Sequence, residues 1–152
     1  MDFGKDMDLK KRPPSIRLAA ITQNCCFTKV FIDSFPINML VDTGSAVPLI
    51  SNGVYKQLGR ARNQLQPVST TLTTSDGEIM NVLGTSNLIL GLDSHSYNQS
   101  AIVADFGSTQ GILGLDFLAK NDVKIDTRRG ALNFPDFDIQ LSTGGGISAH
   151  VR

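Results

Sequence analysis

One aspartate of the sequence stands between an apolar run and a turn. Met39-Leu40-Val41 leads directly into Asp42-Thr43-Gly44-Ser45. A carboxylate at the end of a buried strand is costly unless hydrogen bonds or another polar group accompany it. Gly44 allows a close backbone turn with an open path to the carboxylate, and the Thr43 hydroxyl can brace the loop. The pattern favours acid–base chemistry at Asp42, although Asp, Thr and Gly are also ordinary turn residues.

A second motif, Gly111-Ile112-Leu113-Gly114, lies far downstream. It leads into Leu115–Lys120, which can form one or two helical turns that stop at Asn121. The two motifs, in this order and with an Asp-Gly hairpin signal at Ser75–Glu78 between them, resemble the retropepsin family. These are the aspartic proteases of retroviruses and long-terminal-repeat retrotransposons. The resemblance spans about residues 25 to 135.

The resemblance implies a role for each matching residue. Asp42 is the expected catalytic aspartate, and the residues expected to support its loop are Thr43, Gly44 and Ser45. A hairpin around Asp76-Gly77-Glu78 matches the flap that closes over the substrate. The expected substrate-binding positions are Gly44, Ala46, Val47, Asp76, Gly77, Glu78, Ile79 and Ile112. The strand expected beneath the active-site loop includes Leu113 and Gly114.

The sequence departs from the viral pattern directly after the active-site loop. Viral members often carry acidic residues there, which bind the substrate backbone and help to lock the dimer. This chain has Ala46 and Val47 instead. We therefore expect a more apolar pocket, as in retrotransposon-type members. The flap turn has a single glycine, Gly77, so we expect a stiffer flap than the glycine-rich viral one.

Asp-Thr-Gly occurs once in the sequence. Asp126-Thr127 also follows apolar residues, but Arg128 and Arg129 stand where a glycine and a small residue would be needed, so we interpret it as an outer turn. Peptide hydrolysis of the retropepsin type requires two carboxylates that share one proton. Asp42 must therefore pair with the same residue of a second copy about a two-fold axis. We expect a homodimer that binds an extended polypeptide substrate and uses no cofactor and no metal.

The remaining segments indicate an all-β protein. Ser51 is expected to cap a short helix that ends at Gly59. Strand patterns occupy 28–32, 35–41, 47–50, 67–74, 79–92, 97–104, 123–126 and 131–134. Many short strands joined by turns favour a closed or sandwiched β body. The resemblance specifies a retropepsin-like closed β-barrel of the acid-protease fold, with one flap hairpin and one or two short helices.

Composition limits the other classes of function. Hydrophobic residues make up 41% and charged residues 18%, as in a globular domain. Basic and acidic residues both number 14, so no net charge directs this domain to nucleic acid or to a membrane surface. No apolar run approaches the roughly 20 residues of a membrane span, and the first residues are too polar for a signal peptide. We expect an intracellular protein, in the cytoplasm or in a retroelement particle.

Cysteine and histidine give no competing site. The adjacent Cys25 and Cys26 fit buried packing better than a nucleophile, and two cysteines are too few for a disulfide framework. His95 and His150 are the only histidines, and a metal site would need more ligands at suitable spacing.

We expect three segments: a lead-in or linker at 1–15, the protease domain at 16–137 and a tail at 138–152. The expected function is an aspartic endopeptidase that processes a retroelement polyprotein. Two alternatives stay open. One is a catalytically silent or domesticated relative that serves as a dimerisation module, against which the intact Asp-Thr-Gly-Ser weighs. The other is a cellular retropepsin-like protease attached to adaptor domains.

Overall fold

The computed structural model describes residues 26–61, 64–73, 77–106 and 109–142. These residues form mostly strands, with two short helices, α2 (Asn52–Gln57) and α3 (Leu115–Lys120). The strands are β2 (Phe27–Ile32), β3 (Phe35–Val41), β4 (Leu49–Ser51), β5 (Leu72–Thr73), β6 (Ile79–Leu92), β7 (His95–Asp105), β8 (Gly111–Leu113), β9 (Lys124–Asp126), β10 (Ala131–Asn133) and β11 (Asp138–Gln140). The expected all-β class is confirmed.

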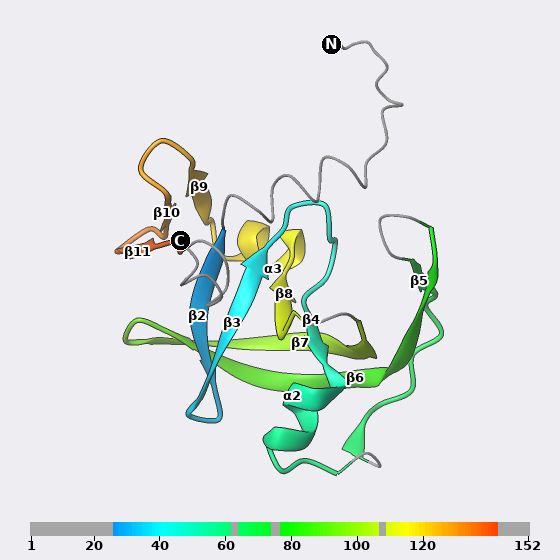
Figure 1. Ribbon diagram of the computed structural model, residues 1–152. Helices are drawn as coiled ribbons and strands as arrows, with labels where there is room; N and C mark the ends of the chain where they lie inside the picture. The colour runs from blue at the N-terminus through cyan, green and yellow to red at the C-terminus, as the bar shows by residue number, and fades with distance from the viewer. Residues whose placement is uncertain (1–25, 62–63, 74–76, 107–108, 143–152) are drawn as a thin grey trace, which may run out of the picture.

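Six of the strands close into a barrel (Figure 1). Their order is β2-β3-β8-β4-β7-β6, and β6 pairs again with β2 through Phe31↔Gly91 and Ile32↔Leu90. The β5 strand adds to the outer edge of β6 and leaves the barrel with it as a hairpin. These two residue pairs close the sheet into a barrel, which supports the loops at its ends.

Alternating side chains build the barrel core. In β2 the buried positions are Thr28, Val30 and Ile32, and in β6 Leu88, Leu90 and Leu92 are at most 1% exposed. This period of two puts one face of each strand inside. The α3 residue Phe117 and β10 residue Leu132 join the same cluster, and burial of each such side chain contributes roughly 1.5–3 kcal/mol.

Local turn and cap signals set most of the element boundaries. Asp33 and Ser34 have φ of 52° and 69°, as a two-residue hairpin turn between β2 and β3 requires. The Ser51 side chain accepts a hydrogen bond from the N–H of Val54 at 3.1 Å, so the predicted N-cap is confirmed. The predicted stop of α3 at Asn121 is confirmed as well.

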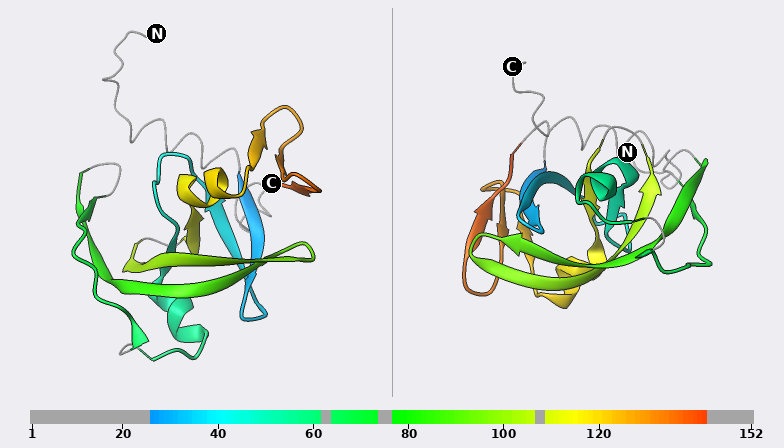
Figure 2. Two further views of the ribbon diagram at one scale, coloured as in Figure 1. Left: turned by 180° about the vertical axis from the view of Figure 1, so that it is seen from behind. Right: turned by 90° about the horizontal axis from the view of Figure 1, so that it is seen from below.

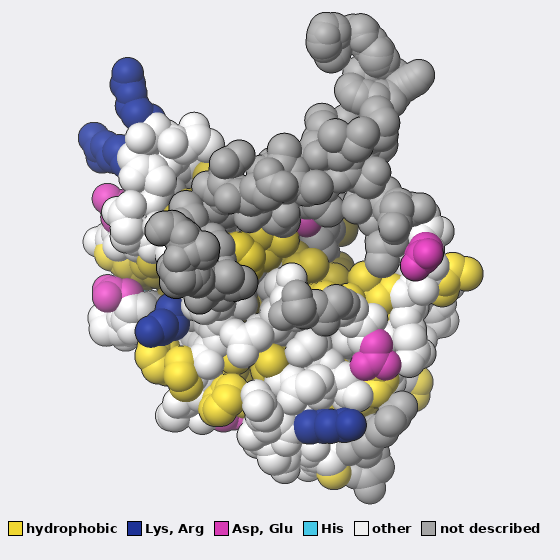
Figure 3. All heavy atoms as spheres, in the orientation of Figure 1, with side chains coloured by type: hydrophobic (Ala, Val, Ile, Leu, Met, Phe, Trp, Pro, Cys, Tyr) yellow, Lys and Arg dark blue, Asp and Glu magenta, His cyan; other side chains and the backbone are white. Residues whose placement is uncertain are grey.

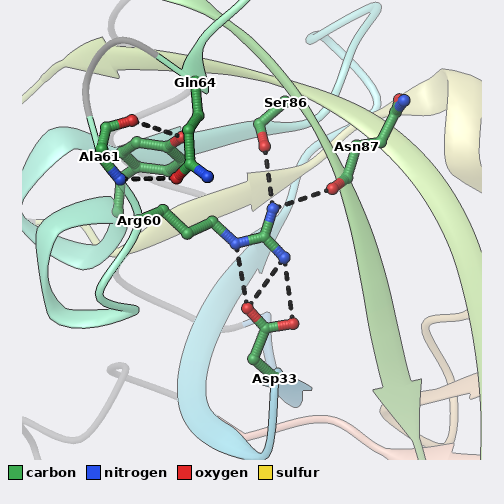
Figure 4. A network of polar contacts seen from close by, with 7 residues as sticks. Asp33, Arg60, Ala61, Gln64, Ser86 and Asn87 are labelled. Carbon is green, nitrogen blue, oxygen red and sulfur yellow. Dashed lines mark hydrogen bonds and ion pairs between the residues drawn. The ribbon is translucent and has the colours of Figure 1, made fainter.

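An ion-pair network fastens the end of α2 to the barrel (Figure 4). The Arg60 guanidinium donates to both carboxylate oxygens of Asp33, with a shortest distance of 2.9 Å. It also donates to the Ser86 hydroxyl and the Asn87 carbonyl, each at 3.2 Å. One side chain thus joins the β2–β3 turn to β6 at the point where the chain leaves for the flap.

The segment before the flap differs from the prediction. A strand was expected over 67–74, but only Leu72–Thr73 forms one. Gln66 instead makes two backbone hydrogen bonds of 2.9 Å with Thr85. A β-bulge between Val82 and Gly84 shifts the register of β6 there. The chain therefore touches β6 at the bulge, separates from it, and pairs again only near the tip.

A small sheet, β9-β10-β11, lies beside the barrel next to β2 (Figure 2). The β9–β10 hairpin was predicted, whereas β11 was not and lies beyond residue 137, the expected end of the domain. Phe27 and Ser142 exchange two backbone hydrogen bonds of 2.8 Å and attach the sheet to the barrel. The sequence signal for β11 is weak because only one of its three residues is apolar.

Stacked rings fill the space between the small sheet and the β6–β7 hairpin. Phe134 stacks on Phe137 at 4.5 Å, and His95 stacks on Phe137 at 4.1 Å. Tyr97 meets Phe117 edge to face at 5.4 Å. Burial, and then the charge of Asp136, raise the pKa of Tyr97, so the phenol stays protonated at neutral pH.

Gly84 provides a test of the bulge. It has φ of +153°, and a Cβ there would lie 2.7 Å from the Gln66 carbonyl oxygen. We predict that Gly84→Ala lowers the free energy of unfolding by about 2–3 kcal/mol. The matched control is Gly53→Ala in α2, where a Cβ meets no atom closer than 3.9 Å. This control should raise the free energy of unfolding by about 0.5–1 kcal/mol. Urea unfolding measures both free energies. Equal changes in the two variants would contradict the close contact between Gly84 and the Gln66 carbonyl.

Candidate active site

The loop 42–48 is held at the end of the barrel by three strands. β8 lies between β3 and β4, parallel to β3 and antiparallel to β4, so that Ile112 pairs with both Leu40 and Leu49. The N–H of Asp42 donates to the Leu113 carbonyl at 3.3 Å and continues the β3–β8 ladder into the loop. In Figure 1 this loop and the β5–β6 hairpin stand at the same end of the barrel.

The Asp42 carboxyl group is partly exposed and has a fixed orientation. The N–H of Gly44 donates to its Oδ1 at 2.8 Å, and the N–H of Ser45 donates to the Asp42 carbonyl at 3.1 Å. A Cβ at Gly44 would lie 3.1 Å from Oδ1, so a side chain there would crowd the carboxyl group. A partly exposed, oriented carboxylate can activate water or exchange a proton with a substrate.

The first turn of α3 supports the loop from below. The N–H groups of Leu115 and Asp116 donate to the carbonyls of Ser45 and Ala46, at 2.7 and 2.9 Å. The Ser45 hydroxyl donates to the Val47 carbonyl at 2.8 Å. The N–H groups at a helix start have no partner inside the helix, and here loop carbonyls satisfy them.

A second apolar cluster, separate from the barrel core, lies between the loop and the flap. Its buried members are Leu49, Ile102 and Ala104, and the half-buried members are Val47, Leu72, Met80, Val82, Phe106 and Ile112. Hydrophobic side chains extend across the middle of this face toward β5 (Figure 3). The cluster thus forms an apolar floor beneath the β5–β6 hairpin.

The structure gathers most of the predicted site residues at this end of the barrel. The loop holds Asp42 to Val47, and Ile112, Leu113 and Gly114 run beneath it. On the flap, Gly77 has φ of +90° and Ile79 is 76% exposed. Glu78 is exposed and has an interaction partner, and Asp76 lies outside the described residues.

The rest of the apolar floor was not predicted from the sequence. Leu49, Ile102 and Met80 were assigned to strands but not to a site. The alternation in β6 and β7 could have separated their two faces. It could not have shown which face lies under the flap, because that depends on the pairing of β4 with β7.

The described residues contain no group of three or more metal-ligating side chains. Cys26 is disulfide-bonded and cannot act as a thiol nucleophile. Asp126 accepts a hydrogen bond from the N–H of Arg129 at 3.0 Å, which is the contact of a capped turn. Within the described segments, no helix has the length and apolarity needed to cross a membrane.

Comparison with known protein families identifies the family of this chain. Residues 28–120 match the family described as "gag-polyprotein putative aspartyl protease". The chain belongs to this family of retropepsin-like aspartic proteases. A search of curated proteins finds no match.

Three solved structures have the same fold as this chain. The retroviral protease-like domain of Ddi1 from Leishmania major has a TM-score of 0.66 and 14% identity, and the match covers 78% of this chain and 94% of that one. The EIAV protease complexed with the inhibitor HBY-793 has a TM-score of 0.57 and 22% identity over 68% and 94%. A retropepsin-like aspartic protease from Rickettsia conorii has a TM-score of 0.51 and 16% identity over 67% and 75%. The predicted closed retropepsin-like barrel is confirmed.

The contact between Gly114 and the loop can be tested directly. A Cβ at Gly114 would lie 2.6 and 2.7 Å from the carbonyl oxygens of Val47 and Ser45. We predict that Gly114→Ala lowers the free energy of unfolding by about 3 kcal/mol, because backbone atoms must move. Ser45→Ala is the control, since it removes one hydrogen bond and adds no atom, and should cost about 1 kcal/mol. Urea unfolding of both variants at the same protein concentration gives these free energies. An unchanged free energy of unfolding in Gly114→Ala would refute the close packing.

Proposed function

We propose that this protein is an aspartic endopeptidase that works as a homodimer, with one Asp42 from each copy. The observation that carries the proposal is the Asp42 carboxyl group, oriented by the Gly44 N–H at 2.8 Å and placed beside an apolar floor beneath a hairpin. Family membership supports the same chemistry. In this proposal Thr43 and Ser45 support the loop, and Gly44, Ala46 and Val47 line the substrate path.

The proposed mechanism requires two carboxyl groups at one site. Two close carboxylates cannot both be ionised, so their pKa values separate and the pair holds one proton. The ionised member accepts a proton from water as it attacks the peptide carbonyl, and the protonated member donates to the carbonyl oxygen. In the single chain Asp42 is partly exposed and Thr43 is exposed, so a second copy can reach them. We expect activity to be highest at mildly acidic pH, where the pair holds one proton.

The proposed substrate is an extended polypeptide with apolar side chains at the cleavage site. Leu49, Ile102 and Ile112 offer an apolar surface, and Ala46 and Val47 add no charge to it. An extended peptide can pair with the flap backbone as an added strand. The flap positions Asp76, Gly77, Glu78 and Ile79 are proposed to cover it from above.

We propose a retroelement polyprotein as the natural substrate, processed inside the cell or the particle. The family description supports this origin. The likeness to the Ddi1 domain favours a second candidate, a cellular retropepsin-like protease attached to adaptor domains. Reverse transcriptase sequence after this region of the full-length gene would support the first candidate, and an adaptor domain beside it would support the second. In both cases we propose that the protease domain begins near residue 16 and includes β11.

Replacement of Asp42 tests the chemistry. We predict that Asp42→Asn lowers kcat for an apolar peptide library by about 10²–10⁴-fold, because the acid–base pair is lost. The control is Asp126→Asn, which changes the other Asp-Thr pair, located in the β9–β10 turn. Cleavage is followed by mass spectrometry, with and without a statine-type mimic of the transition state. Full activity of Asp42→Asn would reject the assignment, and a silent wild-type chain that still dimerises would support the dimerisation module.

Dilution tests the shared site. If each active site needs two copies, specific activity should fall as the protein is diluted below its dimer dissociation constant. Sedimentation velocity over the same concentration series gives the dimer fraction. Activity should follow that fraction, whereas constant specific activity in a purely monomeric sample would contradict a site built from two chains.

A further inference from the structure

The Gln99 side chain is a buried polar group close to the site. It lies on β7, and the residue is 4% exposed. Its Nε2 donates to the Ser100 carbonyl at 3.0 Å and to the Asp116 Oδ2 at 3.3 Å. Both partners are acceptors, so they fix the orientation of the amide. Its Oε1 is buried and has no hydrogen-bond partner within the described part of the chain.

Asp116 connects this amide to the active-site loop. It stands in the first turn of α3 and is exposed. Its carboxylate accepts from Gln99, and its own N–H donates to the Ala46 carbonyl at 2.9 Å. The preceding N–H, of Leu115, donates to the Ser45 carbonyl. A continuous series of contacts thus runs from the barrel wall through the helix start to the loop.

Stability alone gives no reason for an amide at position 99. A buried acceptor without a partner opposes folding, and an apolar side chain of similar size would avoid that effect. The Nε2 contacts only partly offset it, since Ser100 is the adjacent residue. What the amide adds is a directional bond that fixes where the first turn of α3 lies.

We propose that Gln99 is a positioning residue for substrate binding. Through Asp116 it holds the N–H groups that fix the carbonyls of Ser45 and Ala46, and so sets the stretch of loop that lines the substrate path. This inference rests on the proposed function for the role of the loop. Asp42 has separate supports, the Gly44 N–H and the Leu113 carbonyl. Loss of the Gln99 contact therefore raises KM and leaves kcat nearly unchanged.

The test uses four variants of the full chain in the peptide-cleavage assay. Gln99→Leu removes the amide and keeps the volume, and Asp116→Ala removes its partner. Both are expected to raise KM by about tenfold, because the stretch of loop that lines the substrate path loses its fixed position, with kcat within about twofold. Gln99→Leu should not lower the Tm, since the unpaired Oε1 leaves with the amide.

Asp116→Asn serves as the rescue. Its carboxamide oxygen still accepts from Gln99 Nε2, and its amide can donate to the unpaired Oε1. KM should stay within about twofold of the wild type and Tm should rise. Lys120→Ala is the matched control, because Lys120 also joins α3 to β7, through the Asn98 carbonyl at 3.3 Å, but from the far end of the helix. It should leave KM unchanged.

Hydrogen exchange provides a readout that does not need activity. In Gln99→Leu the amide protons of Leu115 and Asp116 should exchange about tenfold faster, while those of β3 keep their rates. Unchanged exchange, or an unchanged KM in an active enzyme, would overturn the positioning role. A wild-type chain that cleaves nothing would refute the proposed function, and the exchange rates would still decide whether Gln99 holds the loop.

Discussion

Gly114 lies so close to the carbonyl oxygens of Ser45 and Val47 that no side chain fits between them. This contact of backbone on backbone depends on β8 running between β3 and β4, and it places the start of α3 under the loop. The N–H groups of α3 then find their acceptors in the loop instead of in water. The position of Asp42 therefore follows from the place of β8 in the sheet, because β3 and β4 hold this strand on both sides.

The barrel separates its apolar residues into two groups with different roles. The larger cluster is enclosed by the sheet and the small helices and holds the fold together. The smaller one, with Leu49 and Ile102 at its centre, faces the flap and includes several side chains that are only half buried. Incomplete burial costs some stability, and it leaves apolar surface that a peptide can cover. The same strands supply both groups, since alternate residues point to opposite faces.

The base of the β5–β6 hairpin is tied to the barrel by several contacts. Arg60 ties the base to the β2–β3 turn and to β6, and Gln66 pairs with Thr85 beside the Gly84 bulge. Beyond the bulge, Asn81 and Val82 of β6 still pair with β7, and Ile79 and Met80 pair with β5.

The sequence by itself determined the local features. It fixed the bounds of β3 and β6, the Ser51 cap, the stop of α3 at Asn121 and the retropepsin-like class, because alternation, caps and turns act over a few residues. The Asp-Thr-Gly-Ser loop and the Gly111–Gly114 segment were predicted from motif and order alone. Only the tertiary structure decided the remaining points. These are the apolar floor beneath the flap, the addition of β11 to the small sheet, and the link from Gln99 through Asp116 to the loop. Each of them joins segments that are distant in the chain, and no local pattern records which distant strand will be the neighbour.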